Sequence, residues 1–207
     1  MKADPADFDL NINPALVCEI LVRFIRNEIT RAGFKRAVLG LSGGIDSSVV
    51  AYLAAKALSP DNVLCVTMPY KTSSEETRRD SQTVIARLGA QSLDVSITPQ
   101  VDAYFAAFGD ASRMRLANKC ARERMTVLYD QSAAFDALVV GTSNKTELLL
   151  GYGTQFGDLA SAINPIGDLY KTQLRKLAVP RGVRREIIKN QPGGDLGGAK
   201  PDDRDVV

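Results

Sequence analysis

The segment that determines the fold reads Leu39-Gly40-Leu41-Ser42-Gly43-Gly44-Ile45-Asp46-Ser47-Ser48. It separates two hydrophobic patterns. The short apolar run before it, residues 36–41, is typical of a buried strand, whereas the Ala- and Leu-rich residues 49–58 after it are typical of a helix. The pattern predicts a strand, a tight turn and a helix. Gly43 and Gly44 permit backbone conformations closed to other residues and let a ligand approach the main chain.

The turn has the features of a phosphate-binding site. The serine hydroxyls and the first N–H groups of the helix, from about Asp46, can bind an anion. The turn is not the common P-loop, because no Lys follows its glycines, and it is not G-x-G-x-x-G. A carboxylate beside an anion makes sense if Mg²⁺ accompanies the phosphates. The alternative is a turn whose glycines serve geometry alone.

Composition indicates a soluble, globular protein. The 207 residues are 45% hydrophobic and 24% charged, and the net charge of +2 gives no global drive toward nucleic acid. No apolar run approaches membrane-spanning length, and the N-terminus lacks a signal-peptide core, so we expect a cytoplasmic protein with no membrane partner. Cys18, Cys65 and Cys120 are widely spaced, which favours buried thiols over disulfides. The chain has no His, which excludes His-based triads.

Helical and strand patterns alternate along the rest of the chain. Asn13-Pro14 begins a first helix that Gly33 ends, and Ser73 with Glu76 predicts a capping box. A turn is expected at 59–61, and strands are expected at 62–68, 91–97 (ended by Thr98-Pro99) and 136–141. Further helices are expected from the capping box to residue 88, at 112–134 and at 183–189. Two shorter helices are expected to end at residue 150, after the polar turn 142–147, and near residue 178. Residues 1–190 are expected to form one domain, and residues 191–207 a weakly ordered tail.

This alternation predicts an α/β fold, a doubly wound, Rossmann-like parallel sheet with helices on both faces. Such sheets bind ligands at the carboxyl ends of strands where the winding reverses. If the first and fourth strands are neighbours there, residues 42–47 and 142–147 face one another across one crevice. Asp46 and Glu147 would then hold a metal between them.

Four segments resemble ammonia-dependent NAD synthetase, a ligase that forms a C–N bond. They are LGLSGGIDSSVVA (39–51), MPYKTSSEE (68–76), LVVGTSNKTELLLGYGTQFGD (138–158) and NPIGDLYKTQLRKLA (164–178). The likeness covers about residues 14 to 196. The SGGxDS loop alone indicates only the ATP pyrophosphatase superfamily, which has an adenine nucleotide alpha-hydrolase-like fold, and the later segments make the family specific.

The resemblance implies a two-step reaction that consumes deamido-NAD, ATP and ammonia and uses Mg²⁺. The deamido-NAD carboxylate attacks the α-phosphate and releases pyrophosphate, and ammonia then displaces AMP. The implied site residues are Gly40, Leu41, Ser42, Gly43, Gly44, Ile45, Asp46, Ser47, Thr142 and Lys171 for ATP, Asp46 and Glu147 for the metal, Arg122 and Gln155 for deamido-NAD, and Asp158 and Lys171 for catalysis. It also implies a homodimer, with free ammonia or a separate glutaminase as the nitrogen source.

Each implied role has a structural alternative. Glu147 could be an ordinary first-turn acid, Lys171 a surface lysine, Asp158 a loop cap, and the Arg-rich helix around Arg122 a solvated face or a nucleic-acid patch.

The chain also departs from the family pattern. Many members have Lys at Gln155, Asp at Ala162, and Ser or Thr at Gly193. The first two departures are interpreted as altered recognition of deamido-NAD. The family also continues beyond the position of Val207, which would fit a truncated product, a short form or a decayed copy.

Two other functions are weighed. The first is a non-catalytic, nucleotide-binding homologue. The second is a tRNA-modifying thiolase, which the placement of the cysteines disfavours.

Overall fold

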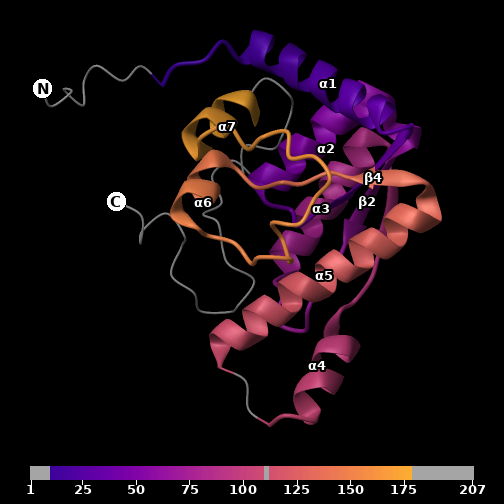
Figure 1. The fold of residues 1–207 in the computed structure, drawn as a ribbon, viewed down its shortest axis with the longest axis vertical. Helices are drawn as coiled ribbons and strands as arrows, with labels where there is room; N and C mark the ends of the chain where they lie inside the picture. The colour runs from indigo at the N-terminus through magenta and orange to yellow at the C-terminus, as the bar shows by residue number, and fades with distance from the viewer. Residues whose placement is uncertain (1–9, 110–111, 179–207) are drawn as a thin grey trace, which may run out of the picture.

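The computed structural model describes residues 10–109 and 112–178, which form a four-stranded parallel sheet with helices on both faces (Figure 1). This confirms the predicted fold class. In chain order the elements are α1 (Pro14–Arg31), β1 (Arg36–Gly40), α2 (Ile45–Leu58), the 3₁₀ helix η2 (Pro60–Asn62), β2 (Val63–Thr67), α3 (Glu75–Leu88), β3 (Gln91–Asp94), α4 (Thr98–Ala106), α5 (Arg113–Phe135), β4 (Ala137–Val139), α6 (Lys145–Leu150) and α7 (Lys171–Ala178).

Each face of the sheet has its own hydrophobic core, because successive strand residues point to opposite faces. On β1, Leu39 packs in a cluster with buried residues of α1, α2 and α7, including Ile25 and Leu174. Its neighbour Val38 packs in a second cluster with Val101 of α4 and Cys120 of α5. Both clusters are apolar and buried, so the strands read as continuous hydrophobic runs.

The winding of the sheet reverses at β1. The strand order is β3-β2-β1-β4, so β1 pairs with β2 on one side and with β4 on the other. The register places Val38 beside Leu64 of β2 and beside Val139 of β4. The predicted adjacency of the first and fourth strands is confirmed. The segments that leave β1 and β4 therefore begin side by side and diverge, which opens a crevice at this edge.

Several predicted helix boundaries are confirmed. The Asn13 side chain accepts hydrogen bonds from the N–H groups of Ala15 and Leu16, and Pro14 is the first helical residue of α1. Ser112 caps α5 by accepting from the Arg115 N–H. The helix predicted at 183–189 and the tail predicted at 191–207 lie outside the described residues.

Other predicted boundaries were wrong. The cap of α3 is Ser74, which accepts from the Thr77 N–H, so the proposed box of Ser73 with Glu76 is not the capping interaction. The third strand ends at Asp94 rather than at residue 97, and the residues expected only to end it, Thr98 and Pro99, begin α4 instead. Proline fits the first turn of a helix, where no N–H is needed.

The fourth strand is also shorter than predicted, and η2 replaces the turn expected at 59–61. Asp136 caps α5 in a left-handed conformation, so the strand cannot begin before Ala137. Beyond Val139 the sheet pairing gives way to one isolated bridge between Val140 and Ile163.

The three cysteines, Cys18, Cys65 and Cys120, are buried and form no disulfide, as predicted. Burial raises the pKa of the Cys65 thiol to about 12, so it is unreactive as a nucleophile at neutral pH. Among residues 10–109 and 112–178, no helix has the length and hydrophobicity needed to cross a membrane.

Gly43→Ala should destabilise the protein more than the matched change Gly33→Ala. Both glycines have a positive φ, +83° and +87°, so the backbone strain is shared. A Cβ at Gly43 would lie 2.4 Å from the Thr77 carbonyl oxygen, whereas a Cβ at Gly33 meets nothing within 4 Å. We expect an extra loss of about 2 kcal/mol in the free energy of unfolding, measured by urea denaturation. Equal losses in the two variants would contradict this packing.

Candidate active site

The crevice at the carboxyl edge of β1 and β4 is a cavity of about 570 Å³. Its lining includes the whole glycine-rich loop, residues 40–47, together with four further residues predicted for the site. These are Thr142, Glu147, Asp158 and Lys171. The two polar turns singled out in the sequence therefore face one another across one cavity.

The glycine-rich loop is held by its own hydroxyl groups. The Ser47 hydroxyl accepts from the Ser42 N–H at 3.2 Å and donates to the Gly44 carbonyl at 3.2 Å, and the Ser48 hydroxyl donates to the same carbonyl at 2.7 Å. Gly44 caps α2 without a side-chain hydrogen bond. The first N–H groups of α2 therefore face the cavity with no side-chain cap, an arrangement that suits an anion.

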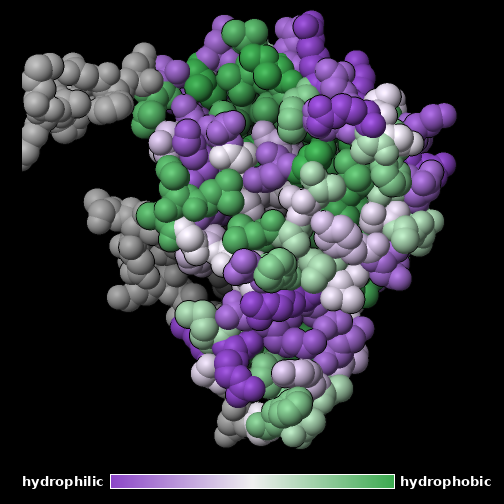
Figure 2. Space-filling model, in the orientation of Figure 1, coloured by the Kyte–Doolittle hydropathy of each residue, from purple (hydrophilic) through white to green (hydrophobic). Residues whose placement is uncertain are grey.

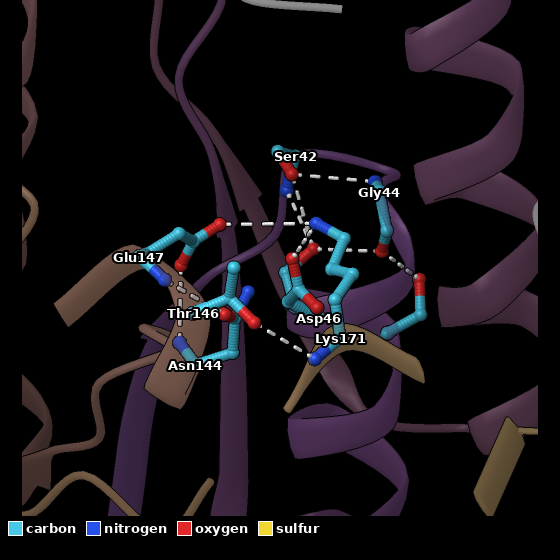
Figure 3. A network of polar contacts seen from close by, with 9 residues as sticks. Ser42, Gly44, Asp46, Asn144, Thr146, Glu147 and Lys171 are labelled. Carbon is cyan, nitrogen blue, oxygen red and sulfur yellow. Dashed lines mark hydrogen bonds and ion pairs between the residues drawn. The ribbon is translucent and has the colours of Figure 1, made fainter. Parts of the chain in front are cut away.

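Asp46, Lys171 and Glu147 meet inside the cavity although they come from α2, α7 and α6 (Figure 3). The Lys171 Nζ lies 2.7 Å from the Asp46 Oδ2 and 3.8 Å from the Glu147 Oε1. The Lys171 N–H donates to the Thr146 hydroxyl at 3.2 Å, which ties the start of α7 to α6. The Lys171 side chain is only 12% exposed, so it is not an ordinary surface lysine.

Glu147 has two roles. Its Oε2 accepts from the Asn144 N–H at 3.0 Å and the Asn144 side chain accepts from the Glu147 N–H at 3.0 Å, which completes a capping box on α6. Its other oxygen faces Lys171. Burial, and then repulsion from Asp46, raise the pKa of the Glu147 carboxyl from 4.5 to about 7. Glu147 is therefore a first-turn acid of α6, as the structural alternative proposed, and its side chain also lines the cavity.

The two carboxylates fit a magnesium ion. The Asp46 Oδ1 is buried and has no hydrogen-bond partner among the residues that the structure describes. A buried carboxylate oxygen without a partner is costly, and a cation would satisfy it. No group of three or more acidic, Cys or His side chains within residues 10–109 and 112–178 could hold a metal. Asp46 and Glu147 match Mg²⁺ in another respect, because this ion commonly binds one or two carboxylates together with substrate phosphates.

Asp158 caps a loop and also lines the cavity. Its Oδ1 accepts from the Thr154 N–H at 2.6 Å, which is the structural alternative considered for it. The Thr154 hydroxyl in turn donates to the Asn118 side chain on α5 at 2.8 Å. The loop that carries Asp158 is thereby attached to α5.

Arg122 and Gln155 lie together, but outside this cavity. The Arg122 Nε donates to the Gln155 carbonyl oxygen at 3.3 Å. Arg122 instead lines a smaller pocket of about 380 Å³ with Tyr104, Phe105 and Lys119. The two positions assigned to deamido-NAD are thus brought together by the fold. The Ala162 N–H donates to the Val139 carbonyl oxygen of β4 at 3.0 Å, and Gly193 lies outside the described residues.

Sequence reasoning missed part of the cavity wall. Arg124 lines it, and its Nε donates to the Met68 carbonyl oxygen at 3.0 Å. Thr77 and Arg78 of α3 also line it. Arg124 could have been noticed, since it belongs to the same Arg-rich helix as the predicted Arg122. It follows Arg122 by two positions and therefore points to a different side of α5. No local signal marks Thr77, whose carbonyl group approaches Gly43.

Comparisons with known proteins agree on one family. The family model described as NAD synthase matches residues 17–207. The NH(3)-dependent NAD(+) synthetase of Trichlorobacter lovleyi is 55% identical over 197 residues, which are 95% of this chain and 72% of that protein.

Two solved structures are also similar. The NH3-dependent NAD synthetase of Campylobacter jejuni is 40% identical, with a TM-score of 0.83 over 86% of this chain and 78% of the other. The NMN synthetase of Francisella tularensis is 29% identical, with a TM-score of 0.89 over 94% of this chain and 82% of the other.

Glu147→Gln should remove a pH dependence of stability. The folded protein keeps the Glu147 proton up to about pH 7, whereas the ordinary pKa is 4.5, so between these values the folded state binds more protons than the unfolded chain. Stability therefore falls as pH rises through this window, by at most about 3 kcal/mol. Gln keeps the capping box. Urea denaturation in EDTA should show the two proteins diverging from pH 5 to 7.5; parallel curves would contradict the raised pKa.

Proposed function

The chain belongs to the NAD synthase family, and we infer that it catalyses the ATP-dependent amidation of deamido-NAD by ammonia, releasing AMP and pyrophosphate. The observation that carries this inference is identity above half with NH(3)-dependent NAD(+) synthetases over 95% of the chain. The cavity supports it, because an uncapped helix N-terminus, two carboxylates and a lysine line one space.

The first step is adenylation of the substrate carboxylate. One of its oxygens attacks the α-phosphorus of ATP, the bond to the bridging oxygen breaks, and pyrophosphate leaves. We propose that the glycine-rich loop, residues 40–47, binds the leaving pyrophosphate through the N–H groups at the start of α2. Thr142 contacts the nucleotide across the cavity. Lys171, held at the cavity by Asp46, stabilises the negative charge that develops on the phosphate oxygens.

Asp46 and Glu147 would hold Mg²⁺ in this scheme. The ion would supply electrostatic stabilisation of the phosphate oxygens during the displacement. The partnerless Asp46 Oδ1 and the inward-facing Glu147 Oε1 are the donor atoms available for it. The raised pKa of the Glu147 carboxyl would return toward its usual range when a cation binds beside it.

The second step is amide formation. Neutral ammonia attacks the acyl carbon of the adenylate, AMP leaves with the bonding electron pair, and a proton is lost. We propose that Asp158 attracts ammonium and accepts its proton, because its carboxylate lines the cavity while one oxygen stays anchored to the Thr154 N–H. Arg122 and Gln155, which lie in contact, would bind deamido-NAD at the neighbouring pocket.

We further propose that the protein works as a homodimer in the cytoplasm, with free ammonia or a separate glutaminase as the nitrogen source. Figure 2 shows hydrophobic side chains gathered over α1. Leu16, Ile20 and Phe24 recur there at every fourth position and are 54%, 53% and 38% exposed, which suits a surface covered by a second copy. Three free, buried thiols suit a reducing compartment.

The reaction can be tested by following pyrophosphate and NAD in parallel. With ATP, Mg²⁺, deamido-NAD and ammonium, we expect equal amounts of both products. Nicotinic acid mononucleotide serves as the competing substrate, because one structural relative is an NMN synthetase. Faster turnover of the mononucleotide would reassign the substrate. ATP binding without any pyrophosphate release would instead favour the non-catalytic homologue.

Asp46→Asn should abolish magnesium-dependent turnover without unfolding the protein. The change keeps the size of the side chain but removes the charge that would hold the ion, so we expect kcat to fall by about 100-fold or more. The matched control is Asp61→Asn on η2, before β2 and outside the cavity lining. Circular dichroism checks the fold. A fully active Asp46→Asn variant would remove the metal assignment.

A further inference from the structure

The cavity wall that follows β2 is held in place partly by residues outside the cavity. Residues 68–73 connect β2 to α3, and Met68, Pro69 and Ser73 line the cavity opposite the second polar turn. These residues have no regular secondary structure. Their position therefore depends on contacts with neighbouring elements rather than on helix or sheet hydrogen bonds.

Main-chain contacts secure the beginning of this wall. The Met68 carbonyl accepts from the Arg124 Nε of α5 at 3.0 Å, and the Pro69 carbonyl accepts from the Ile97 N–H, just before α4, at 3.0 Å. The wall also packs on the phosphate-binding side, since a Cβ added to Gly40 would come within 3.1 Å of the Met68 methyl group. A shift of the wall would therefore disturb the start of the glycine-rich loop.

The side chain of Tyr70 provides the remaining anchor. It is 5% exposed, and its hydroxyl donates to the Asp102 Oδ1 of α4 at 2.7 Å. The other Asp102 oxygen accepts from the Lys71 Nζ at 2.7 Å, and this ammonium lies 5.4 Å from the centre of the Tyr70 ring. The Tyr70 N–H and carbonyl close a turn with Ser73. One aspartate of α4 thus fixes two consecutive residues of the wall.

The protonation states keep this anchor intact near neutral pH. Burial, and then the hydrogen bond to Asp102, raise the pKa of the Tyr70 hydroxyl. The hydrogen bonds from Lys71 and Tyr70 lower the pKa of the Asp102 carboxyl. The hydroxyl therefore remains a donor and the carboxylate an acceptor.

Helix α4 contributes nothing directly to the cavity. None of its residues, Thr98–Ala106, lines the cavity, and neither does Tyr70. We propose that Tyr70 and Asp102 are positioning residues for nucleotide binding, and that α4 serves the site by holding residues 68–73 against the glycine-rich loop through their hydrogen bond. This inference rests on the proposed function only in taking ATP as the ligand of the cavity.

The test measures ATP binding rather than turnover. Isothermal titration of the full chain with ATP and Mg²⁺, without deamido-NAD, is made for Tyr70→Phe, Asp102→Ala and the double variant. Each single variant should weaken ATP binding by about tenfold, the effect of losing one hydrogen bond to a charged group. The double variant should bind ATP as weakly as either single variant, because both changes remove the same interaction.

Two matched controls separate positioning from general destabilisation. Tyr129→Phe deletes a hydroxyl from an exposed tyrosine of α5 that lines neither pocket, and it should leave ATP binding unchanged. Lys71→Met should weaken ATP binding less than about twofold, because the Lys71–Asp102 pair is solvent-exposed, at 55% and 40%. Amide hydrogen exchange should become faster at residues 70–73 in Tyr70→Phe and stay unchanged in α2.

Opposite results would overturn the inference. The inference is overturned if Tyr70→Phe binds ATP with unchanged affinity, or if the losses of the two single variants add in the double variant. It is also overturned if Tyr70→Phe loses as much affinity for deamido-NAD as for ATP. If Tyr70→Phe does not fold, Asp102→Ala carries the same test, since its side chain is half-exposed. Failure of the unmodified chain to bind ATP would overturn the proposed function as well, whereas ATP binding with unaffected variants would overturn this inference alone.

Discussion

The parallel pairing of β1 with two partners is the constraint on which the site depends. Because β2 lies on one side of β1 and β4 on the other, the chain leaves the two central strands in diverging directions. The space between the departing segments cannot be filled by either crossover helix. The first turns of α2 and α6 both open into this space, so the acidic residues of two helix N-termini line one cavity.

Two carboxyl groups and one lysine side chain meet in that space, so its charges favour a cation. Asp46 and Glu147 share a single lysine, which lies closer to Asp46. Burial, and then repulsion from Asp46, raise the pKa of the Glu147 carboxyl. In the proposed scheme, a divalent ion accompanied by phosphate would satisfy both carboxylates and leave the lysine for the anion.

Helices α3, α4 and α5 support the cavity through contacts that lie around the glycine-rich loop. Helix α3 places the Thr77 carbonyl against Gly43, so that only glycine fits there. Helix α5 reaches the end of β2 through Arg124, and α4 reaches residues 68–73 through Asp102. These contacts surround a loop whose internal hydrogen bonds, among the residues that the structure describes, join Ser42, Gly44, Ser47 and Ser48. In the proposed scheme, this supporting layer positions the residues that touch the ligand.

The sequence by itself determined the alternation of strands and helices, the glycine-rich turn, the helix cap at Asn13 and the start of a helix near Ser112, because periodicity and capping act over a few neighbouring residues. It also carried the family resemblance, and with it Asp46, Glu147 and Lys171. Only the tertiary structure decided that Lys171 lies between two carboxylates, that Arg122 contacts Gln155 outside the main cavity, and that Tyr70 bonds to a helix missed from the sequence. Those contacts join residues far apart in the chain, and no local pattern encodes a distance across the fold.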